Sequence, residues 1–378
     1  MVTRRCLYTI RIRGRLGATA LSAFPSMVPE LRDGETLLTG PLKDRSELFG
    51  VLGQLEALGL DLLELRQIQG EARMPASARQ ADPERPPQEL AMNPTTVLGD
   101  KPISRMGFGA MQLAGPGVFG PPRDPDAARA VLRRAIELGV DHIDTSQYYG
   151  PDVVNDLIRE ALYPYPENLM LVTKVGARRD DVGRVHPAQQ PEELRVGVEE
   201  NLRSLRLERL DLVNLRLVGA RDGSGTLLEE QLGALEELRQ EGKLDLIGLS
   251  NVDRAQVQRA LAVVDVAEIQ NLYSIVDRRD EETLVFARER EIAYVPFFPL
   301  GGGPARLAGS PAVLQVADKH RATPAQIALA WLLARYDRML LIPGTSSTAH
   351  LEENVAAVSI QLDDIDLAAL DRVDASGP

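Results

Sequence analysis

Residues 95–378 of this 378-residue chain carry a regular pattern of hydrophobic and polar positions. Short apolar runs alternate with longer stretches whose apolar residues recur at helical spacing. The apolar runs predict eight strands, at residues 106–109, 142–144, 169–173, 211–215, 246–250, 267–270, 293–297 and 340–343. The helical stretches include residues 126–138, 191–205, 227–241, 253–264, 281–290 and 324–335. Eight such repeats predict an α/β fold, a (β/α)₈ TIM barrel whose functional residues lie at the carboxyl ends of its strands.

Residues 1–70 have a different pattern. Strands are predicted at 7–12, at 35–39 after the Asp33-Gly34 turn, and at 60–68, and helices at 18–24 and 45–58. This order indicates a small ferredoxin-like α+β domain without recognisable catalytic residues. Residues 71–94 are rich in proline and polar residues and lack an apolar period, which is typical of a linker. We therefore expect a separate domain, a linker and then the barrel.

Charge is distributed unevenly along the chain. Residues 1–94 hold 12 basic and 12 acidic residues, so the net charge of −12 belongs to the predicted barrel. An acidic balance without a long basic run argues against a nucleic acid or an anionic membrane as partner. A single cysteine, Cys6, excludes an internal disulfide and a cysteine-cluster metal site. With no long apolar run either, we expect a cytoplasmic protein.

Polar residues follow two neighbouring strands of the predicted barrel. Asp144 ends the second strand and Tyr149 follows it, and Lys174 comes directly after the third. Only five of the 43 basic residues are lysines, and a lysine at a crowded barrel mouth needs a carboxylate partner such as Asp144. The pair would lower the pKa of a nearby phenol, for which Tyr149 is the candidate. Each residue alone fits a cap, a snorkelling side chain or a rim residue, but the three together favour an acid–base site.

These residues belong to motifs that resemble the aldo-keto reductases over residues 95 to about 373. The motifs are Gly139-Val-Asp-His-Ile-Asp144-Thr-Ser-Gln-Tyr-Tyr149-Gly150, Val172-Thr-Lys174, Gly248-Leu-Ser-Asn251 and Ile342-Pro-Gly-Thr-Ser-Ser-Thr-Ala-His350. The resemblance implies that Tyr149 protonates a carbonyl oxygen, that Lys174 lowers its pKa and that Asp144 holds Lys174. It also implies hydride transfer from reduced nicotinamide without a metal, and two short strands, 95–98 and 102–104, before the barrel.

The resemblance further assigns a site for NADP(H). The nicotinamide end would be held by Ser250, Asn251 and Gln270, with Phe297 stacked on the ring and Leu300 and Gly301 at the pyrophosphate. The adenosine end would contact Ser346, Ser347 and His350 at the 2′-phosphate, and Glu353 and Asn354 at the adenine. An arginine or lysine commonly binds that phosphate, but Gly344 and His350 stand in those places here. His350 equally fits an ordinary residue at a helix start.

Arg216 occupies the position where the family usually has a catalytic histidine, at the end of strand four. An arginine stays charged near neutrality, can donate to an oxyanion, and would lower the pKa of Tyr149 further. Either Arg216 polarises a substrate with an anionic or phenolic oxygen, or the barrel binds nucleotide with weakened catalysis. The Asn214-Leu-Arg216 ending resembles a bacterial branch that includes pyridoxal reductases.

Two functions from different classes follow. The leading hypothesis is an NADPH-dependent reductase of an aldehyde or ketone, with a pyridoxal-like aldehyde as candidate small-molecule substrate. The alternative is an NADP(H)-binding regulatory or sensor module, whose N-terminal domain contacts a protein partner. Retention of Asp144, Tyr149 and Lys174 favours the reductase. Residues 176–190 and 218–226 would border the substrate as loops.

Overall fold

The computed structural model divides the chain into two compact units, residues 1–89 and 90–377. It describes residues 6–12, 28–32, 35–42, 62–68, 95–218, 228–301, 307 and 309–373. Each unit is considered by itself.

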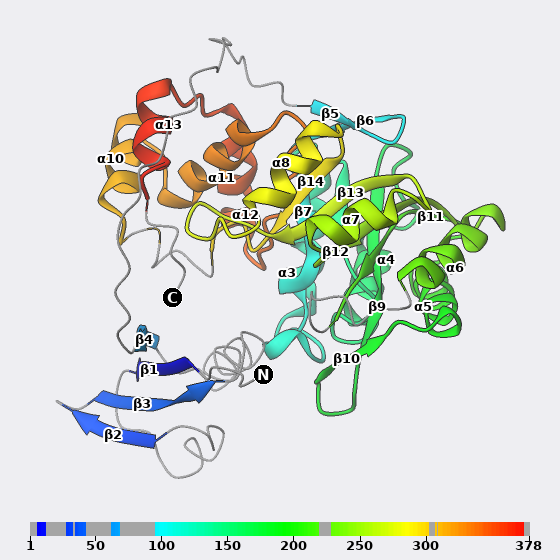
Figure 1. The fold of residues 1–378 in the computed structure, drawn as a ribbon, viewed down its shortest axis with the longest axis horizontal. Coiled ribbons are helices and arrows are strands. Elements are labelled where there is room, and N and C mark those ends of the chain that lie inside the picture. Colours follow the sequence, from blue (N-terminus) through cyan, green and yellow to red (C-terminus); the bar gives the residue numbers. More distant parts are fainter. Residues whose placement is uncertain are drawn as a thin grey trace. The chain divides into compact units, whose positions relative to one another are not determined.

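The first unit contains a four-stranded antiparallel sheet. Its strands are β1 (Cys6–Ile12), β2 (Val28–Arg32), β3 (Glu35–Leu42) and β4 (Leu62–Ile68), in the order β2-β3-β1-β4 (Figure 1). β1, β3 and β4 match predicted strands, whereas β2, which contains Pro29, was not predicted. Among the described strands β2 pairs with β3 alone, and an edge strand tolerates proline. The predicted helices at 18–24 and 45–58 lie outside the described residues, so the ferredoxin-like arrangement stays a prediction.

The second unit is built on a curved parallel sheet. Its strands are β7 (Phe108–Gly109), β8 (His142–Asp144), β9 (Met170–Arg179), β11 (Leu210–Arg216), β12 (Leu244–Ser250), β13 (Val266–Leu272) and β14 (Ala293–Phe297). Each pairs with the next, from β7 to β14. The predicted strand at 340–343 forms only isolated bridges, and Pro343 has no N–H to extend a ladder. These bridges join Met339 to Tyr294 in β14 and Leu341 to Met106 before β7, so they connect the two ends of the sheet.

Helices surround these strands (Figure 1). Their bounds are α3 (Pro125–Glu137), α4 (Val153–Leu162), α5 (Pro191–Leu205), α6 (Leu228–Gln240), α7 (Arg254–Ala260), α8 (Glu281–Glu289), α10 (Pro311–His320), α11 (Pro324–Arg335), α12 (Thr348–Ala356) and α13 (Asp364–Leu370). Capping boxes start several of them: Asp253 with Gln256, Thr323 with Gln326, and Asp363 with Asp366. Such caps satisfy the first N–H groups of a helix, and the starts predicted for α7 and α11 lie within one residue of the observed ones, whereas α13 was not predicted.

A short hairpin covers the amino end of the curved sheet. It consists of β5 (Thr95–Leu98) and β6 (Lys101–Ser104), the two short strands that the family resemblance implied. Leu98 and Ile103 pack against residues from the first halves of β9, β11 and β14. With the amino end filled by apolar side chains, the carboxyl end is left for polar groups.

A second hairpin replaces one of the predicted loops. β9 continues to Arg179 and pairs antiparallel with β10 (Val185–Ala188), so most of residues 176–190 is extended structure and not an irregular loop. Gly176, with φ +99°, makes this path possible, because a Cβ there would lie 2.5 Å from the carbonyl oxygen of Arg216. Most of the other predicted loop, 218–226, lies outside the described residues.

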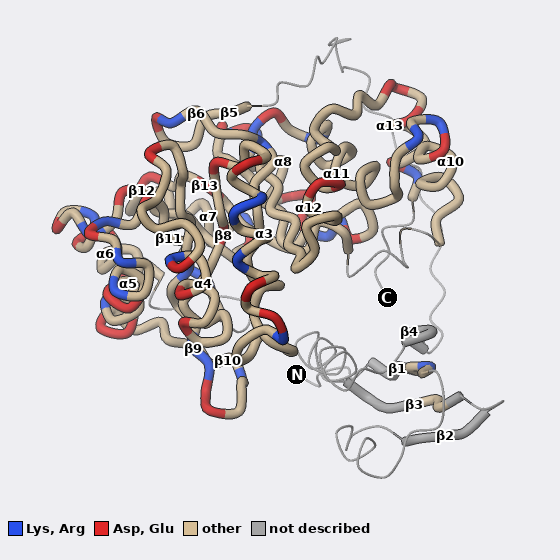
Figure 2. Tube along the Cα trace, turned by 180° about the vertical axis from the view of Figure 1, so that it is seen from behind, with Lys and Arg blue, Asp and Glu red and all other residues tan. Residues whose placement is uncertain are grey.

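Charged residues of both signs are interspersed along the outer helices, for example on α5 and α6 (Figure 2). Arg195 and Glu199 on α5 pair with Glu241 and Lys243, respectively, in the turn that follows α6. Across the described ranges, no helix has the length and apolarity needed to cross a membrane. The same ranges contain no group of three His, Cys, Asp or Glu residues arranged to hold a metal ion.

Candidate active site

Asp144 and Lys174 form a buried ion pair at the carboxyl end of the sheet. Asp144 is the last residue of β8 and Lys174 lies on the neighbouring β9; each is only 3% exposed. The Lys174 ammonium donates to Asp144 Oδ1 at 2.5 Å and to the carbonyl oxygen of Thr145 at 3.0 Å. Gln270 on β13 donates from Nε2 to the other oxygen, Asp144 Oδ2, at 2.8 Å. Both oxygens of the carboxylate are therefore bound, and the ammonium is held in one place.

Tyr149 lies beside this pair. Its ring centre is 5.1 Å from Lys174 Nζ, and its side chain is 7% exposed. The pKa of Tyr149 is raised, first by burial and then by the negative charge of Asp144, while the charges of Arg216 and Arg179 act to lower it. The expectation that Lys174 lowers this pKa stays a prediction: burial sets the upward direction of the Tyr149 pKa, and the two arginine charges oppose it. The phenol therefore keeps its proton at neutral pH, which is the form that a proton donor needs.

Arg216, at the end of β11, contacts two residues assigned to the nicotinamide. Its Nη1 donates to the Ser250 hydroxyl at 2.9 Å, and its guanidinium carbon lies 5.1 Å from the centre of the Phe297 ring. Ser250 is the register partner of Arg216 on the neighbouring strand β12. In this structure, the arginine therefore covers both groups that the resemblance gives to the cofactor.

Arg179 is a site residue that the sequence analysis did not single out. It lies on the β9–β10 hairpin, where it donates from Nε to the carbonyl oxygen of Tyr148 at 3.1 Å and from Nη1 to that of Gly183 at 2.5 Å. Its positive charge acts on the pKa of Tyr149. Residues 176–190 were predicted as a loop that borders the substrate, and the signal in the sequence was the charged run Arg178-Arg179-Asp180-Asp181.

Glu268 is a second residue that the sequence analysis did not single out. Its buried carboxyl accepts from Asn214 Nδ2 at 2.7 Å, between β13 and β11. Burial raises the pKa of Glu268 to about 7, and the charge of Asp144 adds to the rise, whereas the Asn214 hydrogen bond opposes it. Gly248 leaves room for this pair, since a Cβ there would lie 2.2 Å from Asn214 Oδ1. The signal that could have identified it was a glutamate within the predicted strand at 267–270.

The remaining residues assigned to the nicotinamide and pyrophosphate lie at the same end of the sheet. Asn251 has φ +62° and donates from its amide to the Leu217 carbonyl oxygen at 2.7 Å. Leu300 is partly buried, and Gly301 has φ +64° in a turn where a Cβ would lie 2.1 Å from Val276. The neighbouring Ser274 hydroxyl is buried and has no hydrogen-bond partner among the described residues. A glycine turn beside an orphaned hydroxyl suits a ligand with oxygen acceptors.

The residues assigned to the adenosine lie just before and along α12. Ser347 caps this helix by accepting from the backbone N–H of His350, while Ser346, His350 and Glu353 are exposed and Asn354 is buried. An exposed helix N-terminus with hydroxyl groups suits a phosphate. Gly344 cannot be replaced by a phosphate-binding arginine without a shift, because a Cβ there would lie 2.6 Å from the Gly109 carbonyl oxygen. Taken together, the residues present fit a dinucleotide.

Comparison with known proteins decides the family. The model of the aldo/keto reductase family matches residues 105–375. The chain belongs to the aldo/keto reductase family. It is 50% identical over 283 residues to pyridoxine 4-dehydrogenase of Escherichia coli (strain K12), covering 74% of this chain and 98% of that protein. It is 38% identical over 278 residues to an uncharacterized oxidoreductase of Schizosaccharomyces pombe, covering 74% and 89%.

Solved structures of other family members support the same fold. A thermostable aldo-keto reductase in complex with the inhibitor epalrestat is 27% identical with a TM-score of 0.63, covering 73% of this chain and 98% of that one. An aldo-keto reductase from Klebsiella pneumoniae in complex with NADPH is 25% identical with a TM-score of 0.60, covering 72% and 92%. This aldo-keto reductase is therefore an oxidoreductase with a TIM-barrel-like fold. A second family model, described only as a domain of unknown function, matches residues 7–66.

Proposed function

We propose that this aldo-keto reductase uses NADPH to reduce an aldehyde to an alcohol, with Tyr149 as the proton donor. The observation that carries the proposal is the arrangement of Asp144, Lys174 and Tyr149, in which a buried ion pair lies directly beside a protonated phenol. The family, and the high identity to a pyridoxine 4-dehydrogenase along almost the whole length of that enzyme, support it.

Reduction of a carbonyl group needs one hydride and one proton. Bound NADPH would supply the hydride for the carbonyl carbon and leave as NADP⁺. Tyr149 gives its proton to the carbonyl oxygen, and the product is an alcohol. The tyrosinate that remains lies near Lys174, Arg216 and Arg179, whose positive charges stabilise it until solvent returns the proton. Burial thus keeps the proton on Tyr149 before the reaction, and the cations favour its release during the reaction.

The residues of this chain that would hold NADP(H) are those assigned by the resemblance. Gln270 uses its amide nitrogen on Asp144, which leaves its carbonyl oxygen to accept from a carboxamide. Phe297 offers an aromatic face, and the start of α12 offers Ser346, Ser347 and His350 to a 2′-phosphate. Since Arg216 covers Ser250 and Phe297, a nicotinamide that used both would share them with the guanidinium or displace it.

Arg216 and Arg179 favour a substrate that carries an anionic oxygen. Both guanidinium groups act on Tyr149, so a carbonyl compound presented to this phenol lies in a positive field. A pyridoxal-like aldehyde has a phenolic oxygen next to its carbonyl group, and such an oxygen is a good acceptor for a planar guanidinium. This chemistry agrees with the substrate named for the Escherichia coli relative.

The test is NADPH oxidation by the purified full chain with pyridoxal, nitrobenzaldehyde, methylglyoxal and a simple ketone, and NADP⁺ reduction with pyridoxine. We expect the highest kcat/KM for the pyridoxine–pyridoxal pair. Turnover of other aldehydes only would contradict the substrate assignment. Tight NADPH binding without turnover of any of these compounds would contradict the reductase and favour the sensor hypothesis.

A further inference from the structure

A buried polar network lies behind the candidate site, between the sheet and the helices α4 and α5. Its members are Thr145, Asn155, Thr173, Asn201 and Ser204, and the first four are fully buried. Asp144 and Lys174 line the inside of the barrel. Side chains alternate along a strand, so their neighbours Thr145 and Thr173 point to the opposite side, toward the helices.

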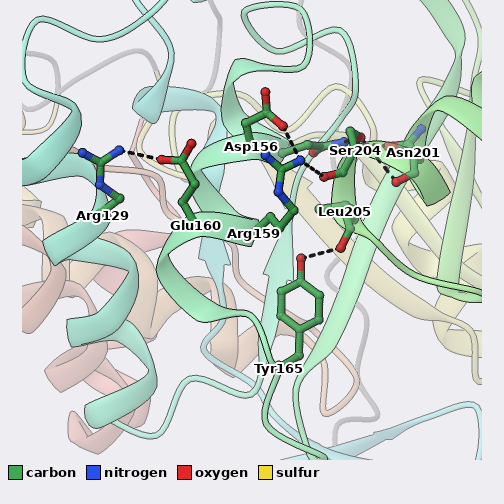
Figure 3. Close-up of polar contacts among 9 residues, drawn as sticks. Arg129, Asp156, Arg159, Glu160, Tyr165, Asn201, Ser204 and Leu205 are labelled. Carbon is green, nitrogen blue, oxygen red and sulfur yellow. Dashed lines mark hydrogen bonds and ion pairs between the residues drawn. The ribbon is translucent and has the colours of Figure 1, made fainter.

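Two asparagines connect the threonines. Thr145 Oγ1 donates to Asn155 Oδ1 on α4 at 2.8 Å, and Thr173 Oγ1 donates to Asn201 Oδ1 on α5 at 2.6 Å. Asn155 Nδ2 donates to Asn201 Oδ1 at 3.0 Å and to Ser204 Oγ at 2.9 Å. Figure 3 shows Asn201 and Ser204 on successive turns of α5. Asn201 Oδ1 thus accepts twice and both Asn155 N–H bonds are used, which fixes the orientation of each amide.

The network reaches the ion pair and the phenol through two short connections. The Thr145 carbonyl oxygen is one of the two acceptors that hold the Lys174 ammonium, and Thr173 directly precedes Lys174. The segment from Thr145 to Asn155 contains Tyr149, and the hydrogen bond between Thr145 and Asn155 joins the two ends of this segment. The backbone N–H of Val154 also donates to the Tyr149 carbonyl oxygen, so α4 begins against the segment that it helps to fix.

We propose that Asn155 and Asn201 are positioning residues. Through the hydroxyl groups of Thr145 and Thr173, they fix the position of the Tyr149 phenol relative to the Lys174 ammonium. This inference rests on the proposed function, because Tyr149 and Lys174 have their catalytic roles there. Proton transfer depends on hydrogen-bond geometry, so a small displacement of the phenol relative to the ammonium slows the reaction without changing how the nucleotide binds.

The test compares variants of the full chain that change one hydroxyl. Thr145→Val keeps the shape of the side chain but removes its hydroxyl, and Thr145→Ser keeps the hydroxyl. The matched control is Tyr165→Phe, which removes the hydrogen bond from Tyr165 to the Leu205 carbonyl oxygen at the end of α5 and does not touch the network (Figure 3). Asn155→Ala tests the asparagine itself. If Asn155→Ala fails to fold, Thr145→Val still tests the network.

Four measurements are compared well below the unfolding temperature of each variant: the single-turnover rate of hydride transfer, its pH profile, the NADPH Kd, and amide hydrogen exchange in residues 145–155. For Thr145→Val we expect a rate about tenfold lower with a shifted pH profile, a Kd within about twofold of wild type, and faster exchange in this segment. Thr145→Ser should recover most of the rate, and Tyr165→Phe should change only the unfolding temperature.

A Thr145→Val variant with the wild-type rate, pH profile and exchange would overturn the inference, whatever its thermal stability. A Thr145→Ser variant as slow as Thr145→Val would do the same, because the hydroxyl would then not be the operative group. If the wild-type chain reduces no carbonyl compound, the proposed function fails. Hydrogen exchange then decides alone whether the network fixes the Tyr149 segment: unchanged exchange in Thr145→Val overturns it.

Discussion

Arg216 donates a hydrogen bond to the hydroxyl of Ser250, its partner on the neighbouring strand, at 2.9 Å. The same guanidinium lies over the ring of Phe297. A histidine is the usual residue at this position in the family, and its side chain is too short to span these groups in the same way. Arg216 therefore links the expected nicotinamide pocket with the space in front of Tyr149.

Arg216→Lys tests the role of the guanidinium. Lysine keeps the positive charge but donates from a single nitrogen without the planar fork, so it reaches a phenolic oxygen and Ser250 together only with poorer geometry. We expect kcat/KM for pyridoxal to fall at least about tenfold and kcat/KM for benzaldehyde to change less than about threefold. Steady-state kinetics with both substrates measure this, and Arg178→Lys, an exposed change on the neighbouring hairpin, is the control. Equal losses on both substrates would show that Arg216 does not recognise the ring oxygen.

Glu268→Gln tests the buried carboxyl between β11 and β13. The pKa of Glu268 in the folded chain is about 7, above its ordinary value of 4.5. Between these values the folded chain holds a proton that the unfolded chain has lost, so this group costs stability as the pH rises. Glutamine does not titrate. We expect the free energy of unfolding of the variant, relative to wild type, to improve by about 2.5 kcal/mol between pH 5 and pH 8.

Urea denaturation at the two pH values measures the effect of Glu268→Gln. Glu237→Gln, at an exposed position on α6, is the control and should show no such dependence on pH. A pH-independent difference between wild type and Glu268→Gln would mean that Glu268 is ionised in the folded chain throughout this range.

His350→Arg tests the assigned 2′-phosphate site. His350 is exposed in the first turn of α12, and an arginine there adds a permanent charge and a bidentate donor beside Ser346 and Ser347. We expect the Kd of NADPH to fall about three- to tenfold while that of NADH changes less than about twofold. Nucleotide fluorescence titration measures both values. Ser359→Arg, beyond the far end of α12, controls for net charge, and an equal effect of the two variants would place the phosphate elsewhere.

The curved sheet was predictable because its repeats leave strong periodic signals. Strand ends such as Asp144 and Ser250 were placed correctly, since apolar runs end where polar residues begin. The predicted strand at 340–343 is not a regular strand, because its apolar residues indicate burial and do not by themselves indicate pairing with a neighbouring strand. The β9–β10 hairpin was missed because its polar residues carry no apolar alternation, and it depends on the backbone freedom of Gly176.

The candidate site was predictable as a set of residues but not as a set of contacts. Motif order placed Asp144, Tyr149 and Lys174 together, and the ion pair is present. The direction of the Tyr149 pKa depends on burial, which a linear sequence does not give. The contacts of Gln270 with Asp144 and of Arg179 with Tyr148 join residues from distant strands or from the missed hairpin, so local patterns could not predict them.

The central claim is that Tyr149 is the proton donor, and Tyr149→Phe tests it most directly. The variant removes the hydroxyl and keeps the ring beside Lys174. With wild-type and variant protein, NADPH Kd and the rate of pyridoxal reduction are measured side by side. We expect kcat to fall by about 10²- to 10⁴-fold, as for the loss of a general acid, while Kd stays within about twofold. Reduction at the wild-type rate by Tyr149→Phe would contradict the account.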